Sequence, residues 1–159
     1  MYRTLLVLSW FGAVIAAIAE PQQTTTSVDG RVLKVLPFLL DERGDNTVSP
    51  SLFDRDAYQE YLRKHPDKVS GVRYDVLWKA KRAAFETITV RVELRGMFEN
   101  KVPRAKTIEK TLDGRPSMRH WTELEMSGTD FGEFGKINAW RATLWCNGVL
   151  LDEYKSFLW

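Results

Sequence analysis

The chain has 159 residues, 44% of them hydrophobic and 28% charged, and its 23 basic and 21 acidic side chains give a formal net charge of +2. This near balance excludes the strongly basic surface that nucleic-acid binding needs, and we expect no nucleic-acid partner. The chain has one cysteine, Cys146, which excludes an internal disulfide, so we expect stability to come from an apolar core.

The first nineteen residues, MYRTLLVLSWFGAVIAAIA, have the three parts of a secretory signal peptide. Arg3 supplies the positive start, an apolar stretch follows, and Ala17-Ile18-Ala19 is a small-x-small cleavage site. The apolar stretch is shorter than the roughly 20 residues that span a bilayer as a helix. We therefore predict cleavage after residue 19, a secreted or periplasmic protein, and no transmembrane segment in the remaining chain. An uncleaved anchor helix is the alternative.

After the predicted signal peptide (1–19), residues 20–30 are polar and predict a flexible lead-in, and residues 31–159 are predicted to form one domain. The domain begins with RVLKVLPFLL (31–40), a short apolar run. Pro37 has no N–H for a central strand position, so this run predicts an edge strand that breaks near its middle.

One helix is predicted, over residues 54–64, because apolar side chains recur there at helical spacing. Ser51 or Asp54 can cap its start, and Pro66 ends it. The predicted apolar face carries Phe53, Ala57, Tyr58, Tyr61 and Leu62, and the opposite face carries Arg55, Gln59, Glu60 and Arg63.

The rest of the chain has the period of two that is typical of strands with one buried face. The clearest cases are VRYDVLWKA (72–80) and TITVRVELR (87–95). Weaker strands are predicted at 105–112 and 118–126, with Asp113-Gly114 as the turn between them. The last two are INAWRATLWC (137–146) and VLLDEYKSFLW (149–159).

These elements predict an all-β chain: an antiparallel β-sandwich of the immunoglobulin or fibronectin kind, with about seven strands and one short helix. A small closed barrel is the alternative.

The last two strands are predicted to form a hairpin through Asn147-Gly148. A two-residue turn would place Arg141 opposite Tyr154 and Trp140 opposite Lys155. Cys146 would then be a small, partly buried side chain beside the turn. An intermolecular disulfide through Cys146, which would link two chains, is the alternative.

The sequence offers little for catalysis. Cys146 would need a base, and the chain has two histidines: His65 at the predicted helix end and His120 in a predicted strand. No Cys or His pair has the spacing of a zinc site, and the acidic segment 40–46 lacks a regular calcium-loop spacing. We therefore expect no enzymatic activity, no metal and no cofactor, and interpret 40–46 as a solvated turn.

Binding through exposed aromatic residues is the better hypothesis. The candidate side chains are Trp121, Trp145, Phe131 and Phe134. We expect a binding or structural module of the cell envelope or extracellular space, with a protein or glycan partner and with 54–64 and the Gly-rich loop 127–136 as contact elements. One alternative is a carbohydrate-binding module that uses Trp121 or Trp145, or a weak hydrolase that uses neighbouring carboxylates. Trp121 would share a strand face with Glu123 and Glu125. Another is a subunit of an envelope complex whose open sheet edge accepts a strand.

Overall fold

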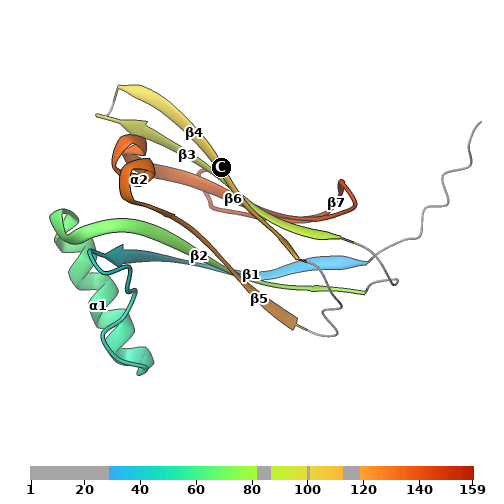
Figure 1. The fold of residues 1–159 in the computed structure, drawn as a ribbon, viewed down its shortest axis with the longest axis horizontal. Helices are drawn as coiled ribbons and strands as arrows, with labels where there is room; N and C mark the ends of the chain where they lie inside the picture. The colour runs from blue at the N-terminus through green and yellow to red at the C-terminus, as the bar shows by residue number, and fades with distance from the viewer. Residues whose placement is uncertain (1–28, 82–86, 100, 113–118) are drawn as a thin grey trace, which may run out of the picture.

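The computed structural model describes residues 29–81, 87–99, 101–112 and 119–159, so the predicted signal peptide and almost all of the predicted lead-in lie outside the described residues. Seven strands of the described part form two antiparallel sheets packed face to face (Figure 1). The chain is therefore an all-β sandwich, as predicted. In the three-stranded sheet the order is β1 (Gly30–Asp41), β2 (Val69–Ala80) and β5 (Arg119–Ser127). In the four-stranded sheet it is β4 (Val102–Leu112), β3 (Ile88–Phe98), β6 (Lys136–Cys146) and β7 (Val149–Lys155).

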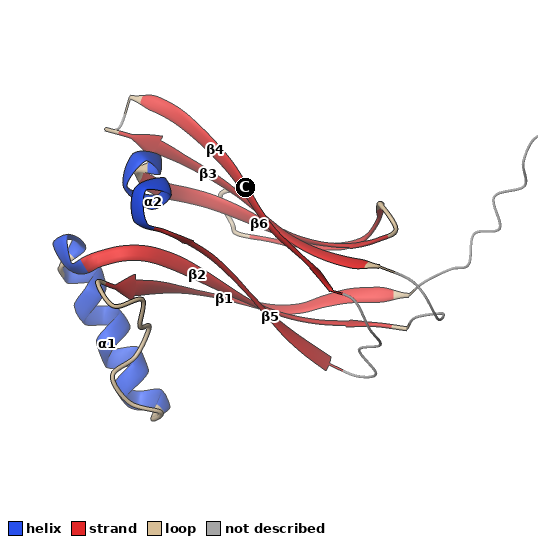
Figure 2. Ribbon diagram, in the orientation of Figure 1, coloured by secondary structure: helices blue, strands red, loops and turns tan. Residues whose placement is uncertain are grey.

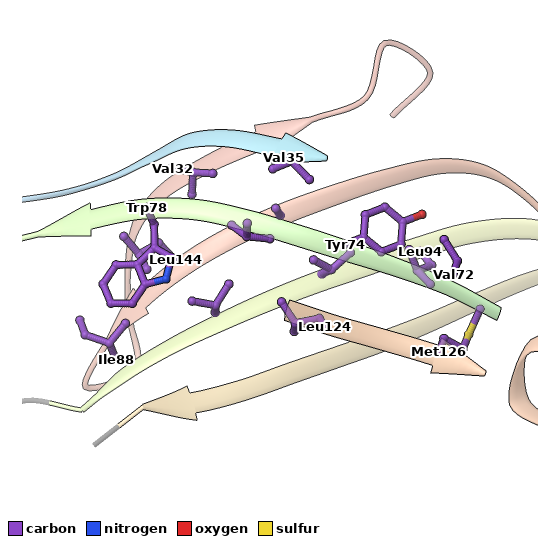
Figure 3. Packing of buried hydrophobic residues seen from close by; sticks show 14 of the residues in the cluster. Val32, Val35, Val72, Tyr74, Trp78, Ile88, Leu94, Leu124, Met126 and Leu144 are labelled. Atoms are coloured by element: carbon purple, nitrogen blue, oxygen red, sulfur yellow. The ribbon is translucent and has the colours of Figure 1, made fainter. Parts of the chain in front are cut away.

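The core lies between the two sheets, where the alternating side chains of β2 and β3 point inward. Figure 3 shows Trp78 of the three-stranded sheet beside Leu144 and Ile88 of the other sheet. Inside this apolar core, the Trp78 indole N–H donates to the Thr122 hydroxyl at 2.8 Å. The prediction of strands that bury one face and leave the other more exposed is confirmed for both β2 and β3.

The first strand, β1, differs from its prediction. It lies at the edge of its sheet, as Pro37 indicated, but it runs unbroken past Pro37, which pairs with Tyr74. The pairing with β2 shifts earlier, between Val32 and Lys34. An edge strand leaves the N–H position on one side unpaired, so a proline there removes no bond from the ladder.

The strands β4 and β5 follow each other in sequence but belong to different sheets. The predicted turn at Asp113-Gly114 between them lies outside the described residues. In constant-type immunoglobulin domains the fourth strand joins the sheet of the first, second and fifth. Here β4 instead pairs with β3, which leaves β5 at the edge of the three-stranded sheet.

The hairpin of β6 and β7 turns at Asn147-Gly148, as predicted, and Cys146 is buried beside it. The predicted register is wrong, because the pairing shifts between Leu144 and Trp145. This irregularity in β7 moves every later pair by one residue, so Arg141 lies opposite Lys155. The strand also ends at Lys155 and does not reach the predicted end of the chain.

Helix α1 (Leu52–Lys64) confirms the predicted helix and its Ser51 cap, but its buried face is not the predicted one. The buried residues are Leu62 and, from the predicted polar face, Gln59. Phe53, Ala57 and Tyr61 are exposed. A short 3-10 turn, η1 (Pro66–Lys68), connects α1 to β2.

The segment predicted as a Gly-rich loop, 127–136, contains a second helix, α2 (Gly128–Phe134). It joins β5 to β6, and Figure 2 shows it at the same end of the sandwich as α1. Gly135 ends the helix with a φ of 78°. A Cβ atom there would lie 2.6 Å from the Met97 carbonyl oxygen, so only glycine fits this close approach.

Candidate functional site

The side chain of Gln59 on α1, which is 3% exposed, binds the free edge of β1. Its amide oxygen accepts the Leu39 N–H at 2.8 Å, and its amide nitrogen donates to the carbonyls of Leu39 and Asn46, each at 2.9 Å. The amide therefore bonds to Leu39 as a neighbouring strand would. It covers part of a sheet edge that would otherwise be open.

A small apolar cluster lies under α1, apart from the main core. Phe38 and Leu40 point to the outer face of β1, opposite to the inward Val35, and both are buried. Leu62 of α1 is also buried, and the Arg55 guanidinium lies 5.0 Å from the centre of the Phe38 ring. The helix therefore rests on the outer face of the three-stranded sheet, at its end.

The first turn of α1 and the segment before it carry a group of exposed apolar side chains, which we call the tip: Val48, Leu52 and Phe53, exposed by 70%, 67% and 80%. Figure 1 shows this end of α1 projecting away from the two sheets. The prediction placed Phe53 on a buried face and did not include Val48 or Leu52. The Ser51 cap was the available signal, because it starts the helix at Leu52 and places Leu52 in the first turn.

A polar hollow of about 480 Å³ lies between α1 and the β1–α1 segment. Within it the Tyr58 hydroxyl donates to Asp41 at 2.7 Å, and Asp41 also accepts the backbone N–H groups of Arg43 and Asp45. The bond to Asp41 raises the pKa of Tyr58 to about 12. Burial acts to raise the pKa of Asp41, but the bonds from Tyr58 and the two backbone groups together hold it below its ordinary value.

Trp121 lies on the outer face of the three-stranded sheet, where it is 47% exposed. Glu123 and Glu125 are exposed on the same face, which is the arrangement the sequence predicted. The Arg73 guanidinium on the neighbouring strand lies 2.8 Å from Asp75 and 3.9 Å from Glu123. Burial raises the pKa of Asp75, although Arg73 counteracts part of this effect.

The other predicted binding residues are dispersed. Trp145 is half-buried on the four-stranded sheet, with the Arg91 guanidinium 5.0 Å from its ring centre and its indole N–H donating to Thr143. Phe134 on α2 is 5% exposed and belongs to the main core, while Phe131 packs partly against that core. The structure thus brings the two phenylalanines together on α2 and joins neither to Trp121 or Trp145.

Signals for α2 were present in the sequence. Phe131 and Phe134 are three residues apart, the spacing of one helix face, and Ser127, Asp130 and Gly135 match a helix start, first turn and end. This pattern indicates a short helix whose two rings face inward.

The residues considered for catalysis are placed as follows. His65 closes the end of α1, where its ring stacks on Tyr61 at 4.2 Å, and His120 on β5 contacts Trp78 edge-on at 5.6 Å. Cys146 is buried on β6. No group of three or more His, Cys, Asp or Glu side chains could hold a metal ion within residues 29–81, 87–99, 101–112 and 119–159. The helices in these ranges also lack the length and hydrophobicity of a membrane-spanning helix.

Comparisons with known proteins give no family. No family model matches the chain, and no curated protein matches it. Among solved structures, the chain is similar to a crystal structure of a protein from Akkermansia muciniphila, with 11% sequence identity, 81% of this chain and 70% of that chain covered, and a TM-score of 0.49.

Proposed function

We propose that the chain is an exported, non-enzymatic binding module of the cell envelope or extracellular space, and that the tip is its contact surface. The observation that carries this proposal is the exposure of Leu52 and Phe53 in the first turn of α1 and of Val48 in the segment before it. Figure 1 shows this end of α1 projecting away from the two sheets. Grouped exposed apolar side chains on a soluble domain are typical of interaction sites. The signal-like segment 1–19 supports export.

The charges around the tip favour a protein partner over a membrane surface. Residues 41–64 contain six carboxylates and four Lys or Arg side chains, so this region is net negative. Anionic lipid surfaces attract basic segments and repel acidic ones. An apolar pocket with a basic rim, on another protein, is the complementary surface.

Site-specific photo-crosslinking in the producing cells tests the contact surface. A crosslinking amino acid at position 53 should give discrete adducts that disappear when Leu52→Asp is added, because a carboxylate cannot enter an apolar pocket without a large desolvation cost. The matched control position is Thr107, which is exposed on β4. Equal adducts at 53 and 107, or none at 53, would contradict the proposed contact.

Export is tested separately by the intact mass of the protein recovered from outside the cytoplasm. We expect a chain that begins at Glu20. A chain that still begins at Met1 and is found in the cytoplasm would remove the exported module from consideration, whatever the tip binds.

A second candidate function is glycan binding through Trp121. Its support is the exposed indole on the same strand face as the carboxylates of Glu123 and Glu125, because sugar rings stack on aromatic faces and hydrogen-bond to carboxylates. Tryptophan fluorescence should then shift on addition of a polysaccharide, and the shift should be absent in Trp121→Ala. A broad glycan panel without any shift argues against this candidate.

A further inference from the structure

The two long sides of the sandwich differ in how their strand edges are covered. On one side β1 and β7 are in contact, and the Val32 N–H of β1 donates to the Asp152 carboxylate of β7 at 2.8 Å. On the other side β5 and β4 approach each other without pairing, and residues of both strands line a hollow of about 240 Å³ near Leu124. In the part of the chain that the structure describes, no strand pairs with the outer edge of β5.

β5 carries outward charges, but it lacks other features that usually protect an edge strand. Natural edges are interrupted by proline, bulges or inward charges. β4 has Pro103, and β1 is covered in part by Gln59. β5 has no proline or glycine, and its pairing with β2 has no shift over nine residues. Its edge is thus regular in register and can accept a further strand.

The charges of β5 are opposite at its two ends. Arg119 lies across from Lys79 on β2, so two cations face each other. Near the other end Glu125 lies across from Arg73 on β2, but Arg73 binds Asp75 and Glu123. Among the described residues, neither Glu125 nor Arg119 forms an ion pair. An added strand that offers an acid to Arg119 and a base to Glu125 would satisfy both ends.

We propose that the added strand is β5 of a second copy of this chain, paired antiparallel about Thr122. A two-fold axis through this position places Arg119 opposite Glu125 of the second copy and Glu125 opposite its Arg119. Thr122 then lies opposite Thr122, a favourable cross-strand pair. The two three-stranded sheets become one continuous six-stranded sheet across a symmetric dimer.

Other antiparallel registers are less favourable. If one strand slid by a single residue along the other, outward side chains of one copy would lie opposite inward side chains of the other, which the alternating burial of β5 forbids. Centring the pair on Glu123 or Leu124 places glutamates opposite glutamates, and like charges directly opposite are destabilising. Centring it on Trp121 places Arg119 opposite Glu123, but it uses only residues 119 to 123 of β5 and leaves Glu125 without an opposite charge. The register about Thr122 uses all residues from 119 to 125, keeps each face intact and pairs opposite charges.

The same register brings the two exposed tryptophans together. Trp121 lies opposite Glu123 of the second copy, so the two Trp121 side chains are diagonal neighbours on the outer face, at a separation that aromatic rings can bridge. The dimer would therefore cover part of the most exposed tryptophan of the sheet. This contact is separate from the tip, and its failure would leave the proposed function untouched.

Charge-reversal variants test the dimer, because two single reversals should weaken it and the double variant should restore it. In sedimentation equilibrium of the whole chain, wild type should dimerise weakly and reversibly, because one strand pair is smaller than the roughly 1,200 Å² of stable interfaces. Arg119→Glu alone and Glu125→Arg alone should each weaken dimerisation by about tenfold, because both symmetric pairs become repulsive. The double variant R119E/E125R restores opposite charges in both pairs and should regain the wild-type dimer.

Lys101→Glu, an exposed charge reversal away from β5, is the matched control and should leave the dimer unchanged. Amide hydrogen exchange locates the contact, and residues 119–125 should become protected as concentration rises. A chain that stays monomeric overturns the proposal. So does a dimer that tolerates Arg119→Glu, that the double variant fails to restore, or that protects another strand instead.

Discussion

The two faces of the three-stranded sheet are covered in different ways. Its inner face is buried by the second sheet, and the contacts there are apolar and continuous, as with Trp78 and Val76. Its outer face is covered at one end by α1, through the Gln59 amide and a few buried side chains, while the rest carries exposed Trp121. One sheet thus has an extensive apolar core on one side and a small, partly polar attachment on the other.

This difference bears on which parts of the molecule can move independently. Local stability follows the number of buried apolar contacts, so the sandwich should open only on global unfolding, whereas α1 can detach at lower cost. The projecting tip belongs to the less stable unit. Variants that damage one face and spare the other separate the two units.

Trp78→Ala should have the largest effect, because it removes a fully buried ring and leaves the buried Thr122 hydroxyl without its partner. We expect a loss of about 4 kcal/mol in the free energy of unfolding, measured by chemical denaturation. Trp121→Ala on the exposed face of the sheet is the matched control and should cost far less. Similar losses in the two variants would mean that the inner face does not dominate stability.

Leu62→Ala should have the next largest effect. We expect it to lower the free energy that holds α1 on the sandwich by about 3 kcal/mol. Leu62 is fully buried under α1 and is not part of the main core. We expect faster amide exchange across α1 while β3 and β6 keep their protection. If β3 and β6 lose protection to the same extent as α1, helix and sandwich form one cooperative unit and the comparison fails.

The sequence predicted the inner face better than the outer one. Alternation in β2 and β3 reports burial directly, because side chains on a strand point to opposite faces and only one face meets the core. The Asn147-Gly148 turn could be predicted equally well, because both positions need positive φ values, here 48° and 81°, which Asn and Gly adopt most easily. These features are local, so a single sequence carries them.

The features that failed depend on tertiary contacts. A helical pattern ranks faces by hydrophobicity. It could not show that Gln59 is buried because Leu39 of β1 and Asn46 of the following segment together offer it three hydrogen-bonding groups. The irregularity between Leu144 and Trp145 likewise left no pattern, and it moved the whole end of β7 by one residue. The candidate site was affected most, because Phe134 was expected outside and lies in the core.

Gln59→Ala should cost about 2 kcal/mol, because it leaves backbone groups of Leu39 and Asn46 without their buried partner. Gln59→Glu should fare no better near neutral pH, since a carboxylate cannot donate to the two carbonyls. Glu60→Ala, at an exposed neighbouring position, is the control. A stable Gln59→Glu variant with α1 still protected from exchange would show that the amide is not what attaches the helix.

Tyr58→Phe should have the smallest effect, about 1 kcal/mol near neutral pH, because it removes one partly buried hydrogen bond to Asp41. The loss should depend on pH with a defined sign. The pKa of Asp41 is lower in the folded protein than the ordinary 3.8, so its bonds stabilise the fold above that pH and the contribution is lost as pH falls through the folded value.

At alkaline pH the sign reverses, because the pKa of Tyr58 is raised from 10.0 to about 12. The folded state keeps the phenol proton, so this contribution is complete below pH 10.0 and is lost as pH rises towards 12. Denaturation of wild type and Tyr58→Phe should therefore give curves that differ near neutral pH and converge at both extremes. If the free energies of unfolding of the two proteins keep a constant difference through the acid range, the hydrogen bond from Tyr58 to Asp41 does not stabilise the helix.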